Sequence, residues 1–279
     1  MRVSAFGAGL AGLLFCVGCG QKTEHPGLPP ACDQAKMNCQ GNPGSGSGSG
    51  TPSSGGGGDD NTAGASNEGN PEVTGRVIEY GDDYFNEGTL LPTQATISAT
   101  GDGGARVSTG YDGKTFDLTG VALLKVNWFL VEPTGNGLLP TLAPVDTTTD
   151  HGAGLTLGVA SSLSLDQIYV NSGTDRSVER AQLVVHVVDS QLRSVPGIRG
   201  TLTTAAEIVL YRMAGTWVPD DGTKSVTDDT GMLFFGNVQA GTGLTKGTLN
   251  LIGSSTTQHL DVDVKGGTVT VVNAILAGK

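Results

Sequence analysis

Two stretches of the chain decide the fold: residues 226–238, VTDDTGMLFFGNV, and residues 108–121, STGYDGKTFDLTGV. Each places Asp and Gly in a turn, a Phe three residues after the Gly, and a Val further on. Asp and Gly suit a tight turn, the Phe fills a core, and the Val belongs to the strand that follows. We therefore expect a repeated hairpin element, with Phe116 and Phe234 as buried equivalents in two β-rich halves.

The composition around these stretches favours strands. The chain has 279 residues, of which 45 are Gly and only 5% are aromatic, so its core must be built from Val, Leu and Ile. Thr, Val and Gly recur, and helix-forming residues rarely run together, which is typical of strands joined by tight turns. A weak helix is expected at residues 161–169, and a two-residue Gly266-Gly267 turn predicts a final hairpin. The expected strands are residues 73–80, 94–100, 105–109, 121–131, 183–188, 207–213, 260–264 and 268–276.

The second half resembles the carboxypeptidase regulatory-like domain. Its signature, T-D-x-x-G-x-F-x-x-x-x-V, is approached by residues 227–238, and residues 188–198, VDSQLRSVPGI, are similar to the opening of that family. Residues 240–242, AGT, resemble the loop that follows. The resemblance implies an all-β fold of two prealbumin-like or Ig-like antiparallel β-sandwich domains, residues 71–165 and 166–279. It also implies an accessory, non-catalytic role.

The N-terminus indicates export. One positive charge at Arg2 precedes an apolar stretch, residues 5–17, which is too short to span a bilayer. The ending Cys16-Val17-Gly18-Cys19 resembles the lipobox of bacterial lipoproteins. That resemblance implies a signal peptide over residues 1–18 and a lipid on Cys19. The alternative is an ordinary cleaved signal. We expect an extracytoplasmic, lipid-anchored protein of the outer membrane or cell surface, with the membrane as its partner through this lipid.

Residues 19–70 are expected to form a disordered tether. Residues 40–70 contain no Val, Ile, Leu, Phe, Tyr or Trp, so this part has nothing to bury against the entropy cost of ordering. A Gly/Ser-rich chain of this length has an r.m.s. span of about 30 Å. Cys32 and Cys39 lie in the tether, and in an oxidising compartment they predict a small disulfide loop.

The folded part offers little sign of catalysis. Its His residues, at positions 151, 186 and 259, lack paired-ligand spacing, and His186 is expected to be a satisfied strand residue. We expect no enzyme, no metal and no cofactor. The net charge of −11 argues against nucleic acid as a partner.

Two loops are candidate ligand sites because aromatic and acidic residues lie side by side in them. One contains Tyr84 and Phe85, and the other contains Trp217, Asp220 and Asp221. Aromatic rings beside carboxylates often hold sugars or peptides, but the simpler interpretation, which we favour, is that each ring caps the open end of its own sandwich. Calcium at the second loop is a weaker possibility, since turns alone explain Asp next to Gly.

We therefore predict a lipid-anchored surface protein that acts as a non-catalytic binding or structural module. Its partner would be an envelope protein or a polysaccharide. The alternatives are a carbohydrate-binding module, or an accessory protein of a secreted or surface enzyme system.

Overall fold

The computed structural model describes residues 72–81, 85, 88–100, 104–122, 125–147, 154–170, 172–222 and 225–276. The predictions for the signal peptide, the tether and the three cysteines Cys19, Cys32 and Cys39 lie outside these residues, as does Tyr84. Within the described part the chain is almost entirely β-structure, which confirms the predicted fold class.

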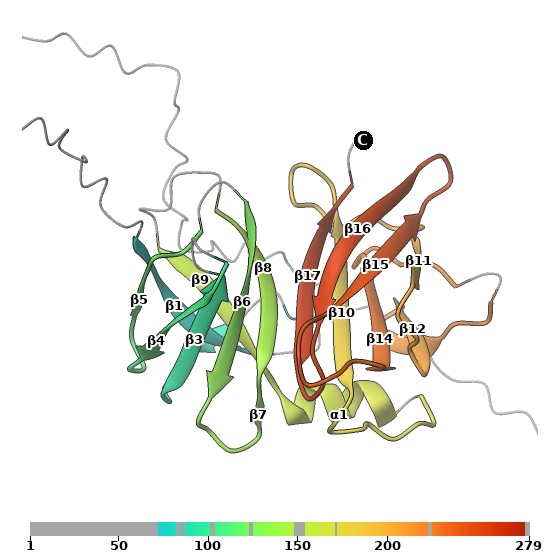
Figure 1. The fold of residues 1–279 in the computed structure, drawn as a ribbon. Helices are drawn as coiled ribbons and strands as arrows, with labels where there is room; N and C mark the ends of the chain where they lie inside the picture. Colours follow the sequence, from blue (N-terminus) through green and yellow to red (C-terminus); the bar gives the residue numbers. More distant parts are fainter. Residues whose placement is uncertain are drawn as a thin grey trace, which may run out of the picture. The chain divides into compact units, whose positions relative to one another are not determined.

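The elements fall into two successive groups along the chain (Figure 1). The first group is β1 Glu72–Tyr80, β2 Gly88–Leu90, β3 Ala95–Thr100, β4 Arg106–Tyr111, β5 Phe116–Thr119, β6 Val126–Pro133, β7 Leu138–Leu139, β8 Thr141–Asp146 and β9 Leu155–Ser161. After α1, Ser162–Val170, the second group is β10 Ala181–Val188, β11 Arg199–Leu202, β12 Ile208–Met213, β13 Thr216–Pro219, β14 Met232–Val238, β15 Thr245–Ile252, β16 Thr257–Val264 and β17 Val269–Ile275.

The first group forms a sandwich around β1. This strand pairs antiparallel with β2 and β5 and parallel with β9, and β9 also pairs with β7. The facing layer runs β8-β6-β3-β4. Apolar side chains from both layers, among them Val77, Ile97, Phe116 and Phe129, form one buried cluster between them. Alternating burial along the strands, as in β5, gives each layer one apolar face.

The second group forms a sandwich around β10. This strand pairs antiparallel with β14 and parallel with β17, and β12 and β13 extend the sheet beyond β14. The facing layer is β11-β15-β16. The core between the layers is built from residues such as Leu183, Val185, Phe235 and Leu251. β1 and β10 therefore occupy corresponding places, each with an antiparallel and a parallel neighbour.

The two halves share a sheet. β8 pairs parallel with β17 through Thr141 opposite Val269 and Leu142 opposite Thr270, and the amide of Val269 donates to the carbonyl of Pro140. This joint makes one nine-stranded sheet, β13-β12-β14-β10-β17-β8-β6-β3-β4 (Figure 1). The boundary predicted between residues 165 and 166 falls inside α1.

A third apolar cluster strengthens the joint. It combines Ala160, at the end of β9, with Leu165 and Ile168 of α1 and with Val184 and Val271 on the second half. The residues from β10, β14 and β17 in this cluster alternate with those of the second sandwich core, so they lie on the outer face of the sheet. The shared cluster means that neither half buries all of its apolar surface alone.

The local predictions for several elements are confirmed. Strands at residues 73–80, 183–188 and 207–213, the β3–β4 hairpin and the short helix all form close to their expected bounds. The predicted strand at 121–131 begins only at Val126.

The predicted fold class holds with one refinement: the sheets are mixed rather than purely antiparallel, because β9 runs parallel to β1 and β17 runs parallel to β10. Two other predictions are wrong. The final hairpin does not form, because the Gly266-Gly267 turn carries the chain from β16 in one layer to β17 in the other. Phe116 and Phe234 are both buried but are not equivalent. Phe116 lies in a sandwich core, whereas Phe234 lies in the third cluster and Phe235 takes the inward position.

Candidate functional site

The predicted aromatic of the second loop, Trp217, is a packed residue. It lies on β13 and is only 3% exposed. Its ring packs edge-on against Phe234, with 6.1 Å between the ring centroids, and the guanidinium of Arg212 lies 5.6 Å from the centroid of the Trp217 ring. A ring held on both sides by its own fold offers no open face to a sugar, so this residue fits the packing interpretation that the sequence left open.

The neighbouring carboxylates shape the loop. Asp220 forms an ion pair with Arg199 at 3.3 Å and accepts a hydrogen bond from the amide of Gly222. Asp221 accepts a hydrogen bond from the amide of Ser225. These contacts are typical of Asp in turns. In the part of the chain that the structure describes, no group of three or more His, Cys, Asp or Glu side chains could hold a metal ion.

The first predicted loop is described only at Phe85. This residue has a left-handed backbone, with φ 53°, and its side chain is 4% exposed. Its ring packs edge-on against Tyr80, with centroids 5.6 Å apart, and it belongs to the third apolar cluster. Phe85 is therefore a buried residue of the joint and not an exposed aromatic.

The two motifs that carry the family resemblance meet in space. The hydroxyl of Thr227 donates to the carbonyl of Val195 and accepts from the amide of Ile198, and the amide of Gly197 donates to the carbonyl of Thr227. Asp228 holds the following turn by accepting from the amide and the hydroxyl of Thr230. Both motifs therefore form one hydrogen-bonded structural unit at the end of the second sandwich.

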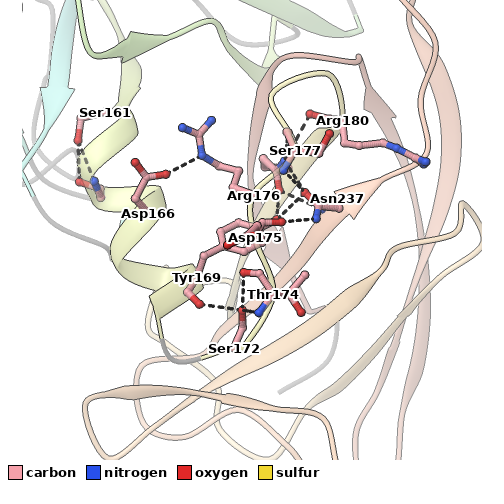
Figure 2. A network of polar contacts seen from close by, with 12 residues as sticks. Ser161, Asp166, Tyr169, Ser172, Thr174, Asp175, Arg176, Ser177, Arg180 and Asn237 are labelled. Atoms are coloured by element: carbon pink, nitrogen blue, oxygen red, sulfur yellow. Dashed lines mark hydrogen bonds and ion pairs between the residues drawn. The ribbon is translucent and has the colours of Figure 1, made fainter.

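A network that no sequence motif marks surrounds the segment after α1 (Figure 2). The hydroxyl of Tyr169 lies 2.5 Å from Oε1 of Gln182 and 3.1 Å from Oδ1 of Asn237, so its one hydrogen is shared between two acceptors. Oδ1 of Asn237 also accepts from the amide of Ser177, and Nδ2 donates to the carbonyl of Asp175. Burial raises the pKa of Tyr169 well above its usual range, so its hydroxyl stays protonated as a donor. We call residues 172–180 the connector.

A polar hollow lies beside this network. It has a volume of about 440 Å³ and its lining includes Asp166, Val170, Thr174, Asp175 and Arg176. Nε of Arg176 donates to Oδ1 of Asp166 at 2.8 Å across the gap between the connector and α1 (Figure 2). The Arg176 side chain is 15% exposed and that of Asp166 is 55% exposed. The hollow thus combines a fixed donor with carboxylate acceptors at the surface.

Sequence reasoning missed this hollow for a physical reason. Asp166 and Arg176 lie ten residues apart on a helix and an irregular segment, and their pairing depends on how the connector folds back on α1. The only available signal was the concentration of polar residues directly after the predicted helix.

Among the described residues, no helix is long and apolar enough to cross a membrane. No protein-family profile matches the chain, and no curated protein matches it either.

Two solved structures show weak likeness to the chain. A streptococcal ancillary pilin matches with 11% identity and a TM-score of 0.26, covering 74% of this chain and 68% of the pilin. The pilus backbone protein RrgB of Streptococcus pneumoniae matches with 11% identity and a TM-score of 0.22, covering 74% and 65%. At these values, the two matches carry no argument about what this chain does.

Proposed function

We propose that the chain is a lipid-anchored protein of the cell envelope that acts as a non-catalytic structural and binding module. The observation that carries this proposal is the joint between the halves, where β8 and β17 pair within one continuous sheet and a third apolar cluster covers it. A fused pair of sandwiches is suited to presenting a surface in a fixed geometry. The tether and the lipid on Cys19 would hold that surface away from the membrane.

The aromatic and acidic residues of the predicted loops support a structural rather than a catalytic reading. Trp217 and Phe85 are buried, and Asp220 pairs with Arg199. An active site instead requires titratable groups that converge on a space where a substrate fits.

The anchor is tested on the full-length protein in its host. Mass spectrometry of the mature N-terminus should find Cys19 carrying lipid, and the protein should fractionate with membranes. A Cys19→Ser variant should lose the membrane association, while Cys32→Ser serves as the matched control. An unmodified N-terminus elsewhere, or membrane association unaffected by Cys19→Ser, would remove the anchor from the proposal.

Carbohydrate binding is a second candidate, and the hollow beside the connector favours it. Sugar hydroxyls both donate and accept hydrogen bonds, and the hollow offers a guanidinium together with carboxylates. A glycan array with the mature protein tests this idea. Binding should weaken at least tenfold in Arg176→Ala, and the Arg180→Ala control, outside this hollow, should leave it unchanged. Equal binding by both variants would exclude the hollow.

A further inference from the structure

The outer face of the second sandwich carries a serine and a histidine in direct contact. Nε2 of His186 lies 2.8 Å from Oγ of Ser194. His186 is on β10 and Ser194 is on the following loop, where it forms an isolated bridge with Val188. A serine hydroxyl within hydrogen-bond distance of an imidazole nitrogen is the basic arrangement of an activated nucleophile.

A third residue lies beside the imidazole. Asn273 of β17 is directly opposite His186 in the parallel register, so the two side chains extend from the same face of the sheet. The interaction with Asn273 raises the pKa of His186, against the larger effect of burial. Nε2 faces Ser194, and in a neutral ring with its proton on Nδ1 this nitrogen is free to accept the hydroxyl proton. This is the tautomer in which histidine takes a proton from serine.

The charge state of the ring also suits a base. Burial is the larger influence on His186 and lowers the pKa of its imidazole below the usual value. The neutral form therefore predominates at pH 7, where a base must have a free lone pair.

The contact between His186 and Ser194 is only partly buried. His186 is the one residue of β10 that is not fully buried, and Ser194 is likewise half-buried. Asn273 and Ile275 on β17 are exposed, Ile275 by 48%. Ser194 is only partly buried, so part of this residue faces solvent. Ile275 is paired with Val188, so an apolar surface lies next to the contact.

The loop holds Ser194 in place. The carboxylate of Asp189 accepts hydrogen bonds from the amides of Gln191 and Arg193 and from Nε of Arg193. The amide of Val195 donates to the carbonyl of Val187. Contacts on both sides of the serine fix its position relative to the histidine, and such positioning contributes to nucleophilic attack.

We propose that Ser194 is a covalent acceptor for acyl groups, with His186 as its base and Asn273 as the positioning residue. Oγ attacks the carbonyl carbon of an activated ester or thioester, and His186 takes the hydroxyl proton. The C–O or C–S bond to the leaving group breaks, and His186 returns the proton to the departing alkoxide or thiolate. The product is an ester on Ser194, with Ile275 beside its acyl chain. This reactivity is independent of the proposed anchoring and binding role.

A fluorophosphonate probe tests the nucleophile in the mature full-length protein. Peptide mass spectrometry should locate one probe per chain on Ser194. The labelling rate should rise with pH through a midpoint below about 6.5, the usual histidine value, and then level off. These two measurements on the unaltered protein need no variant. Label at another residue, or a rate that is flat through this range, would overturn the proposal.

Variants separate the roles of the three residues. Ser194→Ala should abolish labelling, and His186→Gln should slow it by at least 100-fold, the lower range for a lost general base. Ser190→Ala, an exposed serine of the same loop, is the matched control and should label normally. A rate in His186→Gln equal to that of the control would exclude the histidine as the base.

The positioning role of Asn273 is tested by the midpoint of the pH profile of labelling. Asn273→Leu removes the polar side chain beside the ring that raises the pKa of His186, so the midpoint of the labelling profile should move to lower pH and the plateau rate should fall. Asn273→Asp keeps an acceptor oxygen and should restore the plateau. A residue with only a structural role would leave the midpoint where it was, and that result would remove Asn273 from the proposal.

Discussion

The hydroxyl of Tyr169, at the end of α1, lies 3.1 Å from Oδ1 of Asn237, at the end of β14, although 68 positions separate the two residues. Asn237 has a left-handed backbone, with φ 51°, a conformation that Asn tolerates better than most residues. One buried contact therefore links the helix between the halves to the end of β14 in the second sandwich.

Removing the Tyr169 hydroxyl should weaken this link modestly. In Tyr169→Phe the two acceptors keep other donors, because Gln182 still accepts from the amide of Asn237 and Asn237 from the amide of Ser177. The free energy of unfolding should fall by about 0.5–1.5 kcal/mol, the net range for one hydrogen bond. Urea denaturation measures it. Tyr80→Phe is the matched control, and an equal loss in both variants would contradict the role of the bond.

Gly158 should not tolerate a methyl group. A Cβ at this position would lie 1.9 Å from Cζ of Tyr80, whose ring crosses over the glycine. Gly158→Ala should displace the ring and lower the free energy of unfolding by about 1–3 kcal/mol, as overpacking does. Thermal denaturation checks this. Gly154→Ala, where a Cβ meets nothing within 4 Å, should be far milder, and equal melting temperatures would show that the ring moves without cost.

Phe116→Ala and Phe234→Ala should each cost about 3–5 kcal/mol, the range for a core Phe replaced by Ala. Their local effects should differ, because Phe234 packs edge-on against Tyr169 of α1 with centroids 5.7 Å apart, whereas Phe116 lies in the first sandwich core. Hydrogen exchange should therefore quicken in α1 for Phe234→Ala and not for Phe116→Ala. The same exchange pattern in both variants would contradict the assignment of the two residues to separate clusters.

Asp189 should make stability depend on acid pH. The side-chain and backbone hydrogen bonds from Arg193 lower the pKa of this carboxyl in the folded state. Its contribution is therefore present above the unfolded pKa, about 3.9, and is lost as the pH falls through the lower folded value. The stability difference between wild type and Asp189→Asn should be largest near pH 7 and shrink below about pH 4.

Denaturation at several pH values measures that difference. Asp117→Asn, at an exposed position of β5, is the control for a change of net charge alone. A difference that stays constant from pH 7 to pH 2.5 would mean that the charge of Asp189 plays no part.

Local chemistry made much of the fold predictable. The Val, Thr and Ile residues of 73–80 and the apolar run at 183–188 predicted β1 and β10, because β-branched residues favour strands and a short apolar run is typical of a buried strand. Which face of a strand is buried, and which strand it pairs with, depend on residues far away in the sequence. A shift of one position exchanges the two faces of a strand, so the sequence repeat selected Phe234 where the core contains Phe235. Likewise, two adjacent glycines indicate a turn but not the sheet that the chain joins next.

For the candidate sites too, local features could be predicted from the sequence, but contacts between distant residues could not. Aromatic and acidic residues in predicted loops were identifiable, but the burial of Trp217 and Phe85 follows from packing between elements far apart in the sequence. The contact between His186 and Ser194 spans eight residues and depends on the bridge that brings the loop back to β10. Asn273 enters only through the parallel register of β17.

The pairing of β8 with β17 also determines how the two halves should behave when they are produced as separate fragments. A chain ending after β9 would leave β8 with a bare hydrogen-bonding edge, and a chain starting at β10 would do the same to β17. Uncovered strand edges beside apolar side chains recruit other strands. Each fragment, produced alone, should therefore self-associate, and mixing the two fragments should restore a soluble one-to-one complex.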